Sequence, residues 1–371
     1  MGKTRQSGQV KEIFQALKHN LYVHFPFCRI KCAYCALHSR SGSSKETKEV
    51  YVKRLSEAIS AADQQVTFKT VYFGGGTPAL CDLQPLFKSL EKRIDSETEW
   101  TVELNPLDVT DDLLKRLLDG GVNRISMGMQ SLDDGILREM GRGYAFSEAE
   151  RAFFLIKEYF SNAGIDLIIG YPGEKTALSP KHARLAKWGL VHCSAYSLIV
   201  EEKTLLEKKI KNGSVNLPDD DTVMNRLSII DSFLQELGLK RYEISNWSKP
   251  GYECRHNFAV WNGEDYFGLG EGAHGRIGLK RTKNMMSLDT ESDELGIEKV
   301  DEERDRKERY LFSLRTRNGL QISKIEPSER MRATEIMETS VHNGLAEKDG
   351  DTYRLTSRGY EVCDSILEEL I

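Results

Sequence analysis

The sequence predicts a parallel α/β fold, open or closed into a barrel, with a smaller domain after it. Short apolar runs typical of strands alternate with amphipathic helical stretches over the first two hundred residues. The length of 371 residues also exceeds the size of a single core, which is roughly 250 to 300 residues. Polar and glycine-rich motifs follow several of the strands, where parallel α/β folds gather their functional groups.

Six strand-like runs and the helical stretches between them support this class. Helices are predicted at 50–62, 111–118 and 147–160, because apolar residues recur there with a helical period. A strand followed each time by a helix favours parallel pairing. The predicted strands are 21–25, 70–73, 100–104, 123–127, 165–169 and 193–199.

Changes in composition divide the chain into four parts. Residues 1–20 are expected to form an N-terminal extension and 21–284 the core with a trailing strand and loop region. Charged residues dominate 285–309, which predicts a linker leading into a helix. The segment 310–371 resembles a small helical domain with a β-wing and a last helix. Packing or partner docking suits its mixed charge better than DNA binding.

Composition also indicates the setting in which the protein works. The net charge of −5 provides no field for attracting nucleic acid or an anionic membrane. No run of about 18 apolar residues is present, and the first residues lack the apolar core of a signal peptide. Seven scattered cysteines are too few for a disulfide framework and odd in number. We therefore expect a cytoplasmic protein with reduced thiols that is not inserted in a membrane.

The most informative motif is a cysteine triplet after the first strand. Cys28, Cys32 and Cys35 supply three thiolates, one fewer than full ligation of a [4Fe-4S] cluster requires. One iron is then left open for a small molecule. An alternative is a tetrahedral zinc site that adds His38. The compact loop favours the cluster, because structural zinc sites usually draw ligands from two separate segments.

Candidate ligand-binding residues follow the other strands. The run Gly74-Gly75-Gly76-Thr77-Pro78 comes directly after the second strand, and its missing side chains permit close approach of a ligand. Glu103 ends the third strand and is placed to accept hydrogen bonds from a ribose. Three further candidates come from the fourth strand, the loop after it and the fifth strand: Gln130, Arg142 and Asp166.

The order of these motifs resembles the radical S-adenosylmethionine (SAM) family of the oxygen-independent coproporphyrinogen III oxidase type. The resemblance runs from about residue 21 to the C-terminus. Its motifs are the segments 22–28, 74–78, 103–106, 126–131, 242–246 and 255–257, together with the cysteine triplet. It implies a partial (βα)6 barrel with a C-terminal domain, a [4Fe-4S] cluster and SAM, whose reduction by the cluster yields a 5′-deoxyadenosyl radical.

The resemblance also implies roles for individual residues. Cys28, Cys32 and Cys35 would ligate the cluster, and the methionine part of SAM would chelate its open iron. Tyr22 would lie beside the sulfonium and Tyr34 would border the adenine. The methionine amino group would meet Gly75, Gly76 and Thr77, and the ribose and carboxylate would meet Glu103, Gln130, Arg142 and Asp166.

Two departures from the oxidase pattern favour a heme-chaperone branch of this family. The oxidases have a fourth cysteine where this chain has Leu37, and a longer N-terminal extension. Coproporphyrinogen oxidase activity is therefore not expected. The implied function is to bind heme and transfer it to an acceptor protein, with an electron donor protein as a further partner. The alternative is a radical enzyme that acts on a tetrapyrrole or another organic substrate.

A histidine near the end of the core is the candidate heme ligand. The heme-chaperone branch has a His-Asn-x-x-Tyr-Trp element, and this chain has His256, Asn257 and Trp261 with Val260 in the tyrosine position. His256 would supply an imidazole to heme iron. The alternative is that His256 and Asn257 hydrogen-bond a loop that closes the barrel mouth, with Trp261 in the core.

Overall fold

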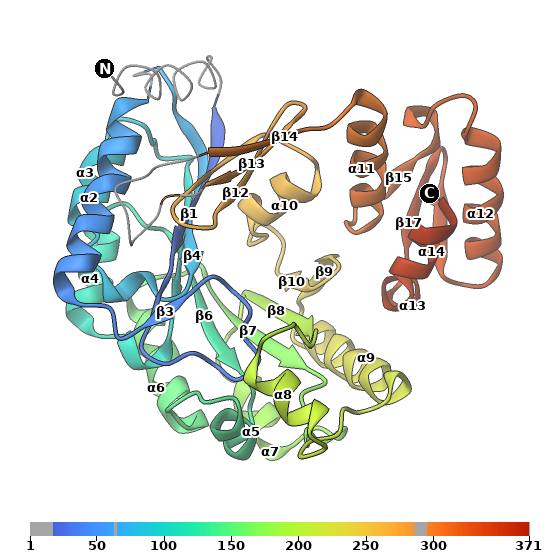
Figure 1. Cartoon of the computed structure of the whole chain (residues 1–371). Coiled ribbons are helices and arrows are strands. Elements are labelled where there is room, and N and C mark those ends of the chain that lie inside the picture. Colours follow the sequence, from blue (N-terminus) through green and yellow to red (C-terminus); the bar gives the residue numbers. More distant parts are fainter. Residues whose placement is uncertain (1–17, 63–64, 285, 287–294, 371) are drawn as a thin grey trace.

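The computed structural model describes residues 18–62, 65–284, 286 and 295–370 (Figure 1). In this part of the chain a twelve-stranded sheet curves around a polar interior. Its strand order is β14-β13-β12-β11-β1-β4-β5-β6-β7-β8-β10-β9. Helices cover the outer, convex side of the curved parallel strands, and a C-terminal unit stands beside the open end of the sheet (Figure 1).

Six consecutive parallel strands form the centre of this sheet and confirm the predicted fold class. Each overlaps one predicted strand, and the structure extends most of them by a few residues. The side chains that point outward from these strands pack against the covering helices and form one continuous apolar core with them. They are β1 (His19–Phe25), β4 (Phe68–Gly75), β5 (Glu99–Leu104), β6 (Arg124–Gln130), β7 (Ala163–Ile169) and β8 (His192–Ser197).

The covering helices form where apolar residues repeat with a helical period. In α4, Thr110 caps the first turn by accepting a hydrogen bond from the Leu113 amide, and the face with Leu114 and Leu117 is buried. The helices of this layer and of the barrel rim are α2 (Lys45–Ala61), α3 (Gln84–Leu90), α4 (Asp111–Asp119), α5 (Asp134–Glu139), α6 (Phe146–Tyr159), α7 (Pro180–Leu185), α8 (Leu205–Lys211) and α9 (Asp220–Glu236). No helix in the described ranges is long and apolar enough to cross a membrane.

Strands on both sides extend the six-stranded centre. On one side β10 pairs antiparallel with β8 and β9; on the other, β11 pairs parallel with β1 and leads into an antiparallel meander. Helix α10 (Arg255–Trp261) lies between these two edges. The strands are β9 (Lys240–Glu243), β10 (Asn246–Ser248), β11 (Tyr266–Leu269), β12 (His274–Ile277), β13 (Lys280–Asn284) and β14 (Leu295–Lys299). A separate pair, β2 (Phe27–Cys28) and β3 (Arg40–Ser41), brackets the cysteine loop.

The C-terminal unit has its own apolar core around Leu314, Met337 and Tyr353. The hairpin of β16 and β17 occupies the position of the predicted wing, and β15 pairs with β17. Its elements are α11 (Glu302–Leu314), β15 (Leu320–Gln321), α12 (Arg330–His342), β16 (Ala346–Asp349), β17 (Thr352–Leu355), α13 (Ser357–Glu361) and α14 (Cys363–Leu370).

The predicted boundaries differ from the structure at two places. Residues 295–299 of the predicted linker form β14, which pairs with β13, and α11 begins inside the same segment at Glu302. High charge does not exclude a strand here, because β14 is an edge strand whose side chains are mostly exposed. Residues 285 and 287–294 lie outside the described residues. Most of the predicted N-terminal extension does as well, and its last two residues begin β1.

A buried carboxylate connects α11 to the meander. Asp305 accepts hydrogen bonds from Arg276, Arg281 and Arg309 at 2.5 to 2.8 Å. Burial alone would raise the pKa of Asp305, but the three guanidinium groups outweigh it and lower the pKa to about 2. The carboxylate therefore stabilises the fold above its unfolded pKa of 3.8, and this contribution is lost as the pH falls from about 4 toward 2.

We predict that Asp305→Asn lowers the free energy of unfolding by about 2 kcal/mol at pH 6, because it removes the carboxylate shared by three guanidinium groups and leaves Arg276 and Arg281 with Glu308 alone. The deficit relative to wild type should shrink as the pH falls below 4. Urea unfolding at several pH values measures both effects, and the exposed Glu302→Gln on the same helix is the control. A deficit that does not change with pH would contradict the assignment of this ion pair.

Candidate functional site

Two cavities lie next to each other on the inner side of the parallel strands. The smaller, of about 620 Å³, is lined by the predicted cluster and SAM residues except Tyr22: Cys28, Cys32, Tyr34, Cys35, Gly75, Gly76, Thr77, Glu103, Gln130, Arg142 and Asp166. The larger, of about 1300 Å³, includes Tyr22 and His256 in its lining. The structure thus brings predicted residues from five successive strands and their following loops to one place, while the predicted heme ligand lines the other cavity.

The three cysteines lie on a tight loop that starts at the end of β2. The amide of Cys35 donates to the carbonyl of Cys32 at 3.2 Å, and all three thiols are unpaired. Arg142 donates from Nη1 to Cys32 Sγ at 3.2 Å, which places a cation beside a sulfur that must become a thiolate to bind iron. Burial raises the pKa of the Cys28 and Cys35 thiols. These features fit a [4Fe-4S] cluster, which stabilises the thiolate form on binding.

The zinc alternative finds no support in this geometry. Among the described residues, no three His, Cys, Asp or Glu side chains converge where they could share one metal ion. His38, the fourth ligand in that alternative, lies with Nε2 at 3.1 Å from Glu271 Oε2. In a [4Fe-4S] cluster each thiolate binds a different iron atom, so the three sulfur atoms need not point at one common position as they must for zinc.

The glycine run at the end of β4 is required because neighbouring parts of the chain pack closely against it. A Cβ on Gly76 would lie 2.5 Å from the Phe27 carbonyl oxygen and 3.0 Å from Cys28 Sγ. Gly75 has a φ of +101°, and a side chain there would collide with the ring of His24. The amides of Gly75, Gly76 and Thr77 all donate within the protein, to Glu103 and to the carbonyls of Phe25 and Phe27. The run therefore offers carbonyl oxygens, not amides, to a ligand.

Two carboxylates share the inner wall of the smaller cavity. Glu103 accepts from the Tyr72 hydroxyl at 2.8 Å and from the Gly75 amide at 3.0 Å. Burial, and then the nearby Asp166, raise the pKa of Glu103 to about 7. Asp166 accepts from Ser126 Oγ at 3.0 Å, and burial raises its pKa as well. Perturbed carboxylates inside a cavity are typical of functional sites.

The end of β6 is strained around Gln130. Its φ of +67° is rare for a residue with a side chain, and the amide of Ser131 donates to the carbonyl of Met129 at 2.9 Å across it. The Gly128 carbonyl accepts from Arg142 Nη2 at 3.0 Å and from Tyr144 at 2.7 Å. This turn aims Gln130 and Arg142 at the cavity, and strain of this kind is often found where a ligand binds.

Glu271 holds the end of the cysteine loop in place. This buried carboxylate accepts from Arg40 Nη2 at 2.7 Å and lies beside His38, while its amide donates to Tyr51. Tyr51 donates in turn to the carbonyl of His24 at 2.8 Å. The sequence alone offered no role for Glu271, because its partners lie more than two hundred residues away.

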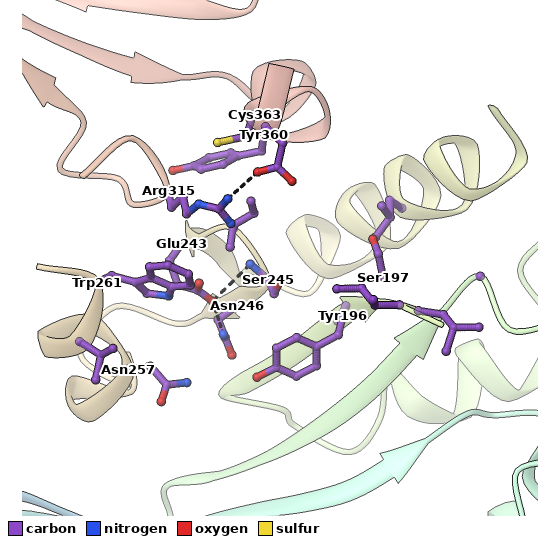
Figure 2. A pocket seen from close by; sticks show the side chains of 18 of the residues that line it. Tyr196, Ser197, Glu243, Ser245, Asn246, Asn257, Trp261, Arg315, Tyr360 and Cys363 are labelled. Atoms are coloured by element: carbon purple, nitrogen blue, oxygen red, sulfur yellow. Dashed lines mark hydrogen bonds and ion pairs between the residues drawn. The ribbon is translucent and has the colours of Figure 1, made fainter. Parts of the chain in front are cut away.

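The larger cavity lies between the barrel and the C-terminal unit. In Figure 2, Tyr196 and Asn246 approach it from the barrel edge, Asn257 and Trp261 from α10, and Arg315, Tyr360 and Cys363 from the opposite side. The apolar side chains of α9 and its preceding loop complete the lining: Leu217, Val223, Met224 and Leu227. A space of this size with apolar and cationic walls suits a large amphipathic ligand.

Each cavity borders the other through a shared wall. Tyr72, Glu103, Tyr196 and Asn257 line both cavities, as does Leu37, the residue at the position of the oxidases' fourth cysteine. Tyr22 donates to or accepts from His24 Nδ1 at 2.9 Å and lines the larger cavity. The structure thus places Tyr22 on the far side of this wall from most of the predicted SAM residues.

His256 lies inside the barrel near the amino ends of β4 and β5, with only 5% of its surface exposed. Its amide donates to Glu99 at 3.0 Å and its ring is surrounded by Tyr22, Tyr72 and Tyr266. Burial, and then the charge of Arg124, lower the pKa of His256 to about 3, so the imidazole is neutral near pH 7.

Sequence reasoning missed several residues of the site. Tyr72, Arg124, Ser126 and Ser194 face the smaller cavity from the parallel strands. The signal that could have found Tyr72 and Ser126 is the two-residue repeat of a strand, since they share a face with Gly74 and Gly128. The place of Tyr196 in the cavity wall could not be read from the sequence, and Asn257, a candidate only as the neighbour of His256, proves to line both cavities.

Comparison with known proteins agrees with this arrangement. The Radical SAM superfamily model matches residues 22–177. The heme chaperone HemW of Mycobacterium tuberculosis is 32% identical, over 95% of this chain and 94% of its own. HemW of Bacillus subtilis is 35% identical, over 71% of this chain and 72% of its own. The structure of Escherichia coli coproporphyrinogen III oxidase, HemN, superimposes with a TM-score of 0.80 at 19% identity, over 100% of this chain and 93% of that one, which shows a shared fold.

The barrel, the cysteine loop and the matching superfamily model define a radical SAM protein, with a fold shared with HemN. Within that class, identity above 30% over 94% of one HemW relative and 72% of another assigns the chain more narrowly. It belongs to the HemW family.

We predict that Glu271→Ala loosens the cysteine loop, because it removes the acceptor for Arg40 and the partner of His38. The free energy of unfolding should fall by about 1 to 3 kcal/mol. After anaerobic reconstitution, iron should be lost to a chelator faster than from wild type. Glu271→Gln retains an oxygen that can accept from Arg40, so its rate of iron loss should lie between those of wild type and Glu271→Ala. Equal iron-loss rates in all three proteins would contradict the proposed role of Glu271.

Proposed function

We propose that this protein is a heme chaperone that holds a [4Fe-4S] cluster and SAM in the smaller cavity, binds heme in the larger one, and transfers the heme to an acceptor protein. The observation that carries the proposal is the shared wall between the cavities. Through this wall a heme bound at His256, near the amino ends of the strands, would face a cofactor bound at their carboxyl ends. The relatives named heme chaperone supply independent support.

The smaller cavity has a matching group for each part of SAM. Cys28, Cys32 and Cys35 would hold the cluster, and Arg142 would balance the charge of the bound thiolates. The methionine amino group, a donor, would meet carbonyl oxygens of the segment 75–77, since the amides there are already engaged. Tyr34 would border the adenine, and Glu103 and Asp166 would accept from the ribose hydroxyls, with Gln130 beside them. The bound cluster supplies one-electron reduction of the sulfonium.

The larger cavity would hold heme through His256. A neutral imidazole is the form that binds iron, and the burial of His256 keeps it neutral. Val260 and Trp261 on the same helix, and the apolar residues of α9, would contact the porphyrin faces. Because Val260 has no hydroxyl, His256 and Asn257 would supply the polar contacts that α10 makes with the heme.

The partners follow from this arrangement. A heme acceptor protein would receive its ligand at the open side of the larger cavity, and an electron donor protein would reduce the cluster. We place the protein in the cytoplasm, and the seven unpaired cysteines are consistent with a reducing environment.

Heme titration of the anaerobically reconstituted protein tests the proposal. We predict a saturable Soret band in wild type and binding at least tenfold weaker in His256→Ala, because the iron loses its ligand. His274→Ala is the matched control, since His274 lines the same cavity but is exposed. Absence of heme binding, together with release of 5′-deoxyadenosine that depends on an added organic substrate, would instead establish a radical enzyme.

A second prediction concerns the pH dependence of SAM binding. Ribose hydroxyls donate best to an ionised carboxylate, and Glu103 has a raised pKa of about 7. The affinity for SAM should therefore increase as the pH rises from 6 to 8. The glutamine in Glu103→Gln cannot ionise, so at pH 8 this variant should bind SAM about tenfold more weakly than wild type. Its affinity for SAM should also change little between pH 6 and 8. Equilibrium dialysis of the reconstituted proteins gives both curves. A pH profile shared by variant and wild type would refute the role of Glu103.

A further inference from the structure

We infer that Thr70 and Asn20 fix the tautomer of His256, so that its Nδ1 carries the proton and its Nε2 presents a lone pair to the larger cavity. The inference rests on the proposed function in so far as that lone pair is for heme iron. Thr70 and Asn20 belong to strands β4 and β1 and are absent from the motifs that the sequence singled out. Both are buried, with 1% of their surface exposed.

The direction of each hydrogen bond follows from what its atoms can do. Asn20 Nδ2 donates to the carbonyl of Asp265 at 3.0 Å and lies 3.5 Å from a carboxylate oxygen of Glu264. Both of those oxygens only accept, so the amide nitrogen must face them. The oxygen Oδ1 of Asn20 therefore faces Thr70.

Thr70 has one hydroxyl proton to give. Its Oγ1 lies 2.9 Å from Asn20 Oδ1, which cannot donate, so Thr70 donates there. The same Oγ1 lies 2.8 Å from His256 Nδ1. Since the hydroxyl proton is already used, Nδ1 must be the donor in this second bond. A neutral imidazole has one N–H group, and with the proton on Nδ1 the other nitrogen, Nε2, has a free lone pair.

The other ring nitrogen is open to the cavity. No hydrogen bond to Nε2 is present among the described residues, and Nε2 is not one of the buried polar atoms that lack a partner. His256 is part of the cavity lining. In metal sites a histidine typically donates from its second ring nitrogen to a protein oxygen, which orients the ring and raises its basicity. The Asn20–Thr70 pair supplies that arrangement before any ligand binds.

The wild-type protein tests the tautomer without heme. In a long-range ¹H–¹⁵N spectrum of the histidine-labelled protein, protonated and unprotonated ring nitrogens are resolved, and the loss of signals in His256→Ala assigns this residue. We expect Nδ1 protonated and Nε2 unprotonated. Thr70→Val keeps the branched shape but removes the acceptor, and should produce a mixture of tautomers. Thr70→Ser retains the hydroxyl and should restore the wild-type spectrum.

Heme titration of the same variants tests the consequence. Thr70→Val should bind heme about tenfold more weakly than wild type and Thr70→Ser nearly as well as wild type. Added to His256→Ala, Thr70→Val should cause no further loss, because the two residues act through one bond to iron.

Two results overturn different claims. A wild-type spectrum with the proton on Nε2, or a Thr70→Val spectrum identical to that of wild type, overturns this inference whether or not heme binds. If wild type shows the predicted tautomer but His256→Ala binds heme as tightly as wild type, the proposed heme site is wrong and the tautomer assignment is still supported.

Discussion

The hydrogen bonds along one face of strand β1 are the interaction on which both cavities depend. Asn20, Tyr22 and His24 alternate with the buried Leu21, Val23 and Phe25, so the polar side chains share the inner face. At one end of this row Asn20 bonds Thr70 next to His256. At the other, His24 donates from Nε2 to the carbonyl of His38 at 2.8 Å, which holds the end of the cysteine loop.

The pairing of β1 with β4 sets this row in register. Asn20 lies opposite Thr70 and Tyr22 opposite Tyr72, and a shift by one residue would turn every polar side chain into the apolar core. Because β11 pairs with the other edge of β1, the meander and the barrel share this strand. The cysteine loop and the His256 site are thus connected through β1, although Cys35 and His256 are 221 positions apart in the sequence.

The sequence was sufficient where local patterns decide the structure. The six parallel strands were predictable because each is a short apolar run next to an amphipathic helix, and the cysteine loop because its spacing is self-contained. The larger cavity was not predictable, since its walls come from β8, α9, α10 and the C-terminal unit. Nor were the roles of Glu271 and Thr70, whose partners are set by strand register and loop closure. Charged composition suggested a linker where β14 forms, because an exposed edge strand needs few apolar residues.

The central claim is that two adjoining cavities inside the barrel hold an iron–sulfur cluster and a heme. Anomalous scattering at the iron edge, from crystals of the protein reconstituted anaerobically and loaded with heme, tests it most directly. We predict two separate iron sites, one within the loop of Cys28, Cys32 and Cys35 and one next to His256 Nε2 in the larger cavity. A heme iron found away from His256, or iron at the cysteine loop alone after heme loading, would contradict it.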